Sequence, residues 1–149
     1  MKIPEIEIKV QLKDNVKVSE LYKIESSKDA ANVFRQIFNA DTILWQEEFV
    51  MLCLNRSNAV TGFYKVSSGG MHGTVVDPKI VYTVALKSCA TSLIVAHNHP
   101  SGNLKISEAD RKITQKLRDS GKILEIQLLD HLVITQESYL SMADQGLLW

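Results

Sequence analysis

A short apolar run that ends in two histidines limits the folds open to this chain. Residues 93–96 are Leu-Ile-Val-Ala, the composition of a buried strand, and His97 and His99 follow with one residue between them. Because side chains in a strand alternate between its two faces, His97 and His99 point the same way. Two imidazoles on one face can bind the same ion, so the sequence predicts half of a metal site at the end of a buried strand.

An aspartate follows this strand at a distance that permits a third ligand. Asp110 lies eleven residues after His99, beyond a loop containing Pro100 and Gly102, and an amphipathic helical pattern begins there. The loop is long enough to fold the carboxylate back onto the histidines. Zinc bound by two imidazole nitrogens and one carboxylate oxygen keeps its fourth tetrahedral position open, which is typical of a catalytic site. We therefore expect Zn²⁺ as the cofactor, with His97, His99 and Asp110 as its ligands.

The segment from Ser107 to Asp110 has a second interpretation, as the amino terminus of a helix. Ser107 can act as the N-cap, and Asp110 in the first turn complements the helix dipole. A single histidine at the end of a strand is likewise more often a polar loop residue than a ligand. The two interpretations of Ser107 and Asp110 do not exclude each other, because a capped helix presents a carboxylate rigidly to an ion.

The sequence resembles a known family, the JAMM or MPN+ metalloprotease-like domain, in its bacterial RadC version. The shared pattern is His-x-His-Pro, a spacer and Ser-x-x-Asp, and the RadC form HNHPSG is present unchanged at residues 97–102. The resemblance extends from about Trp45 to the C-terminus. It departs at Ile106, where the RadC pattern has a proline before the serine.

The resemblance implies an α/β fold, a three-layer mixed sheet flanked by helices, as in JAB1/MPN and cytidine-deaminase-like domains. It also implies a zinc-dependent hydrolase that cleaves an amide, peptide or isopeptide bond, with His97, His99 and Asp110 as metal ligands. The family uses a glutamate on an earlier strand as general base, and its pattern Glu-x-Phe selects Glu47. Alternation places Glu48 on the opposite face of that strand, and the apolarity of the two faces does not decide between them.

The same family pattern gives Ser107 a second expected role. Its hydroxyl would donate a hydrogen bond to the oxyanion that forms when hydroxide attacks a carbonyl, and losing one such donor typically lowers the rate by about 100- to 1000-fold. Glu47 and Ser107 are therefore the expected catalytic residues. The expected substrate is a protein or peptide that the sequence does not identify.

Composition and charge leave two other function classes open. The chain has 17 basic and 17 acidic residues, so no global charge draws it to nucleic acid or to a membrane. The stretch 105–122 is locally basic, which keeps DNA binding, in line with the family's DNA-repair name, as one alternative. The other is a non-catalytic MPN-type interaction module, although such modules lack the ligand set that this chain retains. The sequence also leaves a homo-oligomer open.

The chain carries no sequence signal for a membrane or for export. No apolar run approaches the ~20 residues that span a bilayer, and the amino terminus lacks a signal-peptide core. We therefore expect a cytoplasmic protein without membrane contact. Cys53 and Cys89, the only two cysteines, lie in apolar stretches and are expected to be buried free thiols.

The patterning divides the chain into two parts, 1–42 and 43–149. The first part is predicted to form an amino-terminal hairpin, with strands at 6–12 and 16–21, and a helix at 28–39 capped by Ser26 or Ser27, packed on the same domain. The second part is the one that resembles the RadC-type MPN+ domain. Its strands are expected at 44–54, 59–67, 73–76, 91–97, 124–129 and 132–135. Its helices are expected at 78–89, 108–120 and 138–144.

Several single residues are assigned within these elements. Asp77 and Pro78 are expected as the N-cap and first residue of their helix. The helix at 108–120 is expected to bury Ala109, Ile113 and Leu117 and to end at Gly121. His131 is expected outside the metal set, and His72 in a surface loop.

Overall fold

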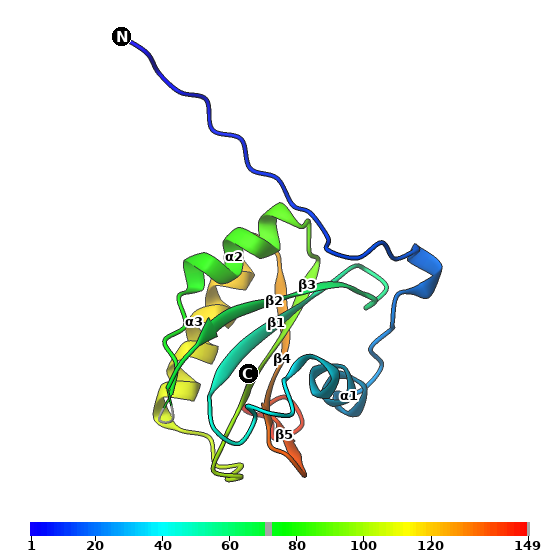
Figure 1. Cartoon of the computed structure of the whole chain (residues 1–149), viewed down its shortest axis with the longest axis vertical. Helices are drawn as coiled ribbons and strands as arrows, with labels where there is room; N and C mark the ends of the chain where they lie inside the picture. Colours follow the sequence, from blue (N-terminus) through cyan, green and yellow to red (C-terminus); the bar gives the residue numbers. More distant parts are fainter. Residues whose placement is uncertain (71–72, 149) are drawn as a thin grey trace.

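A mixed five-stranded sheet lies at the centre of the protein. The computed structural model describes residues 1–70 and 73–148. The strands lie in the order β2-β1-β3-β4-β5 (Figure 1). Strands β3 and β4 are parallel, and the other neighbouring pairs are antiparallel. The strands are β1 (Glu48–Leu54), β2 (Val60–Ser68), β3 (Ser92–Asn98), β4 (Gln127–Ile134) and β5 (Tyr139–Ser141).

Strands β1 and β3 are buried along their whole length because their sequences are nearly continuous apolar runs. Alternate residues of β1 belong to two separate hydrophobic cores. Phe49 and Met51 belong to one core, and Val50 and Leu52 belong to the other. The sheet therefore has two covered faces.

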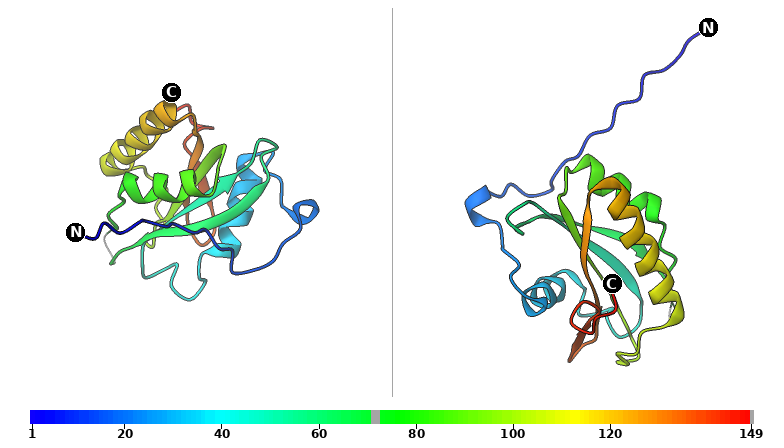
Figure 2. Two further views of the ribbon diagram at one scale, coloured as in Figure 1. Left: turned by 90° about the horizontal axis from the view of Figure 1, so that it is seen from above. Right: turned by 180° about the vertical axis from the view of Figure 1, so that it is seen from behind.

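Helices cover both of these faces. Helix α1 (Ser27–Ile37) packs Ala30 and Phe34 on the face that holds Val50, whereas α2 (Pro78–Lys87) and α3 (Glu108–Leu124) cover the face that holds Phe49 (Figure 2). The result is the three-layer α/β fold with a mixed sheet that the sequence predicted, and this prediction is confirmed.

The α-helices begin at residues whose side chains accept hydrogen bonds from free amides of the first turn. Ser26 caps α1, and Asp77 caps α2 with Pro78 in the first turn. In α3, Ser107 Oγ accepts from Asp110 N–H, and the Asp110 carboxylate accepts from Ser107 N–H, each at 3.0 Å. This reciprocal capping box satisfies two amides that would otherwise lack partners. It also fixes the direction of the Asp110 side chain.

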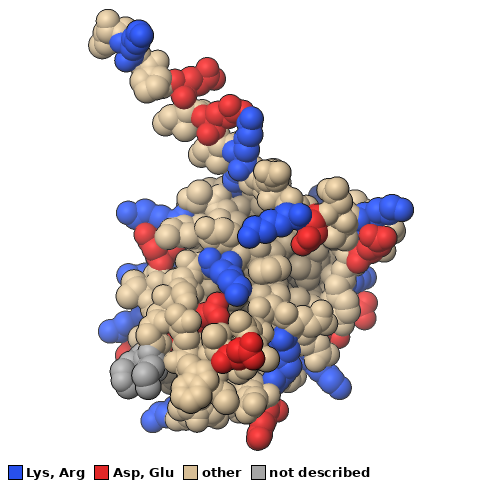
Figure 3. All heavy atoms as spheres, in the orientation of Figure 1, with Lys and Arg blue, Asp and Glu red and all other residues tan. Residues whose placement is uncertain are grey.

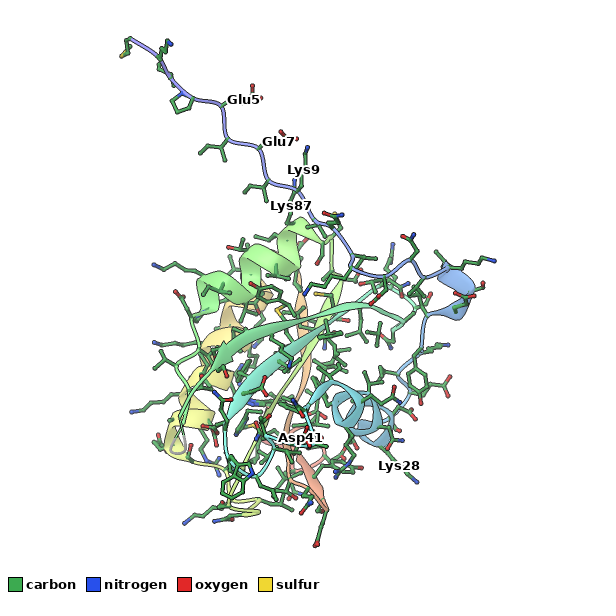
Figure 4. All side chains as sticks on the ribbon, viewed as in Figure 1. Glu5, Glu7, Lys9, Lys28, Asp41 and Lys87 are labelled. Carbon is green, nitrogen blue, oxygen red and sulfur yellow. The ribbon has the colours of Figure 1, made fainter. Side chains whose placement is uncertain are left out.

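The predicted amino-terminal hairpin is wrong. Residues 1–17 form an extended arm without a strand, and the short 3-10 helix η1 (Val18–Glu20) follows where the second strand was expected. Figure 4 shows Glu5, Glu7 and Lys9 on the part of the arm that projects from the body of the protein. An isolated two-stranded hairpin is marginal in water because it has no further strand or helix to pack its apolar side chains against. The arm's alternating apolar side chains are exposed, which agrees with this reason.

Two predictions near the C-terminus are also wrong. The strands expected at 124–129 and 132–135 are the single strand β4, because Asp130 and His131 are buried and hydrogen-bonded within it and do not form a turn. The helix expected at 138–144 is instead β5 followed by a turn. Ser141 pairs with Leu132 at the edge of the sheet, and its hydroxyl donates to the Asp130 carboxylate.

Helix α3 continues past Gly121 and does not end there. Gly121 is buried inside the helix, where a Cβ would overlap the carbonyl oxygen of Ile126 and lie 2.7 Å from the Tyr82 hydroxyl. The helix ends at Leu124, and Glu125 follows as its C-cap with a left-handed φ of 57°. Ala109 is exposed, against the prediction, because the first turn of α3 lies at the rim of a cleft described below.

Two smaller differences concern residues 73–76 and Cys89. Residues 73–76 form no strand, and Gly73 makes a single bridge to Gly70. Cys89 is exposed, because it lies just beyond α2 with a left-handed φ of 54°, whereas Cys53 is buried as expected. The prediction for His72 lies outside the described residues.

The surface carries charges of both signs. Figure 3 shows Lys and Arg side chains interspersed with Asp and Glu side chains over the face drawn there. This matches the formal net charge of +0. Among the described residues, no helix combines the length and apolarity that crossing a membrane requires.

Candidate metal centre

The carboxyl end of β3 places two histidine rings in contact. His97 is the penultimate residue of the strand and is 1% exposed, and His99 follows the strand directly. Their Nε2 atoms lie 2.8 Å apart, and the ring planes are inclined at 61°. Both side chains thus face one point at the end of the sheet.

The first turn of α3 brings the Asp110 carboxylate to the same point. Its Oδ1 lies 3.3 Å from His97 Nε2, and its Oδ2 lies 3.5 Å from His99 Nε2. Burial alone would raise the pKa of Asp110, but the adjacent imidazole rings of His97 and His99 outweigh it, and the pKa lies far below its usual range. The carboxylate is therefore ionised and offers negative charge between the two rings.

Glu47, immediately before β1, supplies a second carboxylate. Its Oε1 lies 3.9 Å from His97 Nε2 and 4.0 Å from His99 Nε2. One ligand atom each from Glu47, His97 and His99 lie within 4.8 Å of one another, an arrangement that could hold a metal ion. The contacts from Glu47 are longer than hydrogen bonds, whereas Asp110 is closer to both rings. Two carboxylates therefore reach the centre at different distances.

Glu48 is directed away from the rings, as alternation along a strand requires. Its carboxylate pairs with Lys65 at 3.4 Å, and its backbone N–H donates to Asn98 Oδ1 at 2.7 Å. The structure thus separates Glu47 from Glu48, which the apolarity of the strand could not do.

His131, which the sequence analysis set apart from the ligands, lies directly behind His97. Its Nε2 is 2.7 Å from His97 Nδ1, the ring nitrogen that faces away from the centre. Phe49 packs against both rings, parallel to His97 and edge-on to His131. Burial lowers the pKa of His131 well below its usual value, so the ring is neutral.

Thr114 is a member of this cluster that the sequence analysis missed. It is buried on α3, and its hydroxyl oxygen lies 2.6 Å from His131 Nδ1 and 2.6 Å from the carbonyl oxygen of Asp110. A signal was available in the sequence: Thr114 follows Asp110 by one helical turn, and residues four apart share a helix face.

His99 is oriented by the loop after β3. Its Nδ1 lies 2.6 Å from the carbonyl oxygen of Asn103. A carbonyl only accepts, so Nδ1 carries a proton, and the Nε2 lone pair of His99 is free for a metal ion only in the neutral ring. Without a metal ion, the 2.8 Å contact with His97 Nε2 needs a proton, which the charged ring of His99 supplies. Burial lowers the pKa of His99, but Asp110 and the Asn103 carbonyl outweigh it, and the net change is upward. The surroundings of this ring therefore favour positive charge at the centre.

The donor set fits a divalent metal ion. Two imidazole nitrogens and a carboxylate oxygen form the protein ligand set of several catalytic zinc sites. Imidazole ligands also suit copper, iron and nickel. The side chains therefore indicate a class of transition-metal ions and do not select one element. The fit is supported by the ionised Asp110 and by the Nε2 atom of His99 that faces His97.

A cleft with a volume of 530 Å³ opens onto the centre. Ser107 lines it and is exposed at the amino terminus of α3, so its hydroxyl is accessible from the cleft. The remaining walls come from the start of β1, the segment after β2, the loop after β3 and the first turns of α3. They are formed by Glu47, Phe49, Gly73, Thr74, Val76, His97, His99, Pro100, Ser101, Asn103, Lys105, Ala109, Asp110 and Ile113.

The mixed sheet with a His-x-His pair beside a carboxylate from the next helix is the arrangement that the resemblance to the JAB or MPN type of α/β domain implies. The family model described as "RadC-like JAB domain" matches residues 24–147. The chain belongs to this family. The matched residues include α1, which shares one hydrophobic core with the sheet.

The chain is also similar to curated proteins named UPF0758 protein. The relative from Flavobacterium johnsoniae is 45% identical over 130 residues, which cover 87% of this chain and 56% of the relative. The relative from Bacillus pumilus is 39% identical over 127 residues, covering 85% and 55%. One from Clostridium perfringens is 33% identical over 138 residues, covering 93% and 60%. The chain thus spans little more than half the length of these relatives.

Proposed function

We propose that this chain is a zinc-dependent hydrolase that cleaves an amide, peptide or isopeptide bond. The observation that carries the proposal is the convergence of His97 Nε2, His99 Nε2 and the Asp110 carboxylate, with Glu47 nearby, at the base of one cleft. A zinc ion at this point would polarise a carbonyl group and make hydroxide available at about pH 7. A non-catalytic interaction module has no need for this ligand set.

The distances favour different roles for the two carboxylates. Asp110 lies 3.3 and 3.5 Å from the two ring nitrogens and is the better candidate for the third metal ligand. Glu47, at 3.9 and 4.0 Å, is set further back, which suits a general base. In this role, Glu47 takes a proton from the attacking water and passes it to the leaving nitrogen.

Ser107 is the proposed donor to the developing oxyanion. Its Oγ accepts from Asp110 N–H at 3.0 Å, which uses a lone pair and leaves the hydroxyl proton free to donate. The same side chain thus caps α3 and presents a donor to the cleft. A donor held in place before the reaction stabilises charge without reorganisation.

The DNA-binding alternative rests on the basic stretch 105–122. Within it, Arg118 pairs with Asp119 at 3.0 Å and donates to the carbonyl oxygen of Leu148. Part of the positive charge of this stretch is therefore already engaged inside the chain. A nuclease assay remains the natural comparison for the proposed hydrolysis.

The proposal is tested by an activity screen of the zinc-loaded chain. Peptide libraries and isopeptide-linked conjugates are incubated with the protein beside single- and double-stranded DNA. Zinc-dependent cleavage of an amide bond that is lost in His99→Ala supports the proposal. Cleavage of DNA alone, or amide cleavage that survives in His99→Ala, contradicts it.

A further inference from the structure

A line of three short contacts runs from the backbone of α3 to the candidate metal centre. The Asp110 carbonyl oxygen lies 2.6 Å from Thr114 Oγ1, which lies 2.6 Å from His131 Nδ1. His131 Nε2 in turn lies 2.7 Å from His97 Nδ1. Thr114, His131 and His97 are all buried, so solvent does not replace these partners.

The line has only one arrangement of protons that gives every contact a donor. A carbonyl oxygen only accepts, so the Thr114 hydroxyl must donate to Asp110. Its oxygen then accepts from His131 Nδ1–H. His131 is fully buried and its two ring nitrogens contact a hydroxyl and an imidazole, so a charged ring would be costly there and His131 carries a single proton. Its Nε2 therefore accepts from His97 Nδ1–H. In neutral His97, the Nε2 atom that faces the centre is therefore unprotonated.

The opposite arrangement leaves a contact without a proton. If Thr114 donated to His131, its oxygen would face the Asp110 carbonyl oxygen at 2.6 Å with no hydrogen between them. Two acceptors at that distance in a buried site repel each other and lack partners. The proton on His131 would then move to Nε2, and His97 would carry its proton on Nε2. That tautomer of His97 cannot bind a metal ion through Nε2.

We propose that Thr114 and His131 are positioning residues that hold His97 in the tautomer with a free Nε2 lone pair. This inference rests on the metal site proposed above. Helix α3 then contributes twice: the Asp110 side chain reaches the centre, and the Asp110 carbonyl sets the direction of the hydrogen bonds behind it. The loop achieves the same for His99 through the carbonyl of Asn103.

The first test compares two substitutions of Thr114. Thr114→Val keeps the shape of the side chain and removes the hydroxyl, whereas Thr114→Ser keeps the hydroxyl. Loss of a group that orients a metal-ligating histidine typically weakens metal affinity by about 10- to 100-fold. We expect that loss of Zn²⁺ affinity in Thr114→Val, measured by competition with a chelator dye, and little change in Thr114→Ser. Equal affinities in Thr114→Val and the unsubstituted chain would overturn the inference.

The second test uses the unsubstituted protein and therefore does not depend on the folding of a variant. Nitrogen-15 spectra of histidine side chains in the metal-free protein report which ring nitrogen carries the proton. We expect Nδ1 to be protonated in both His97 and His131. A proton on His131 Nε2 would overturn the inference, whatever the variants do.

The two tests also separate this inference from the proposed function. Expected tautomers in a chain that binds no Zn²⁺ would support the assignment of the protons and defeat the proposed hydrolase. Tight Zn²⁺ binding with the proton on His131 Nε2 would defeat the role of Thr114 and His131 and leave the hydrolase standing.

Discussion

The two faces of the sheet use their buried polar groups differently at the end of β3. His97 and Asn98 are adjacent and equally buried, but they face opposite cores. The Asn98 side chain makes three hydrogen bonds to backbone: it accepts from Glu48 N–H and donates to the carbonyls of Ile43 and Gln46. It holds the segment before β1, and its carbonyl oxygen and both of its N–H donors already have protein partners.

On the other face, the two histidines each keep one ring nitrogen that has no backbone partner, and these two nitrogens face each other. The Nε2 atoms of His97 and His99 point into the cleft, and their outer nitrogens are satisfied by His131 and by the Asn103 carbonyl. The comparison teaches that burial alone does not identify a functional polar residue. The residue to seek is one whose partners fix it and still leave one lone pair free.

The largest expected effect separates the two neighbouring glutamates. Glu47→Gln should lower the rate of amide hydrolysis by about 100- to 10,000-fold, because general base catalysis contributes that much. Zn²⁺ affinity should be retained, because Asp110 remains. Glu48→Gln, on the other face, is the matched control and should change the rate only slightly. Equal losses in the two variants, measured at saturating zinc, would break the comparison.

Ser107→Ala separates the two roles proposed for the Ser107 hydroxyl, as the N-cap of α3 and as a hydrogen-bond donor to the oxyanion. Loss of the cap should destabilise the protein by about 1 kcal/mol, read from urea unfolding. Loss of an oxyanion donor should also lower turnover by about 100- to 1000-fold. Full turnover of the folded variant would leave Ser107 with the capping role alone.

Asn98→Ala should act on stability and leave the centre intact. The substitution strands one buried N–H and two carbonyl groups, so we expect a loss of about 3 kcal/mol in the free energy of unfolding. His97→Ala is the paired control, because it should abolish Zn²⁺ binding. The substitution at position 98 should therefore lower stability, whereas the substitution at the adjacent position 97 should remove Zn²⁺ binding. Loss of Zn²⁺ binding by folded Asn98→Ala would contradict this division.

Gly121→Ala tests how closely α3, which supplies Asp110 and Thr114, packs against Tyr82 and the backbone of Ile126. The added Cβ would overlap the Ile126 carbonyl oxygen, so we expect destabilisation of about 1–3 kcal/mol. Lys122→Ala, at the neighbouring exposed position, should change stability by less than about 0.5 kcal/mol. Thermal unfolding of the two variants would show the difference, and equal melting temperatures would contradict close packing at Gly121.

The parts of the protein that the sequence predicted well are those decided by local patterns. The apolar residues of β3 define a strand without reference to anything else, and the caps at Ser26, Asp77 and Ser107 act within one helical turn. The alternating residues of the arm gave an equally clear pattern, but a strand needs a partner, and the pattern does not say whether one exists.

The same reason explains the errors at the C-terminus and the omission at the centre. Ser141 is part of β5 only because β4 offers an edge and Asp130 an acceptor, and both lie elsewhere in the chain. Thr114 carries no metal-ligand signal of its own. Its place in the cluster depends on the meeting of α3 with β4, which periodicity does not specify.

The most direct test is a crystal structure of the zinc-loaded chain with anomalous scattering recorded at the zinc edge. We predict one zinc peak within about 2.0–2.2 Å of His97 Nε2, His99 Nε2 and an Asp110 carboxylate oxygen, with Glu47 beyond bonding distance. A zinc ion bound by Glu47, with the Asp110 carboxylate bonded only to Ser107 N–H, would contradict the proposed centre. A zinc peak away from both histidine rings would also contradict it.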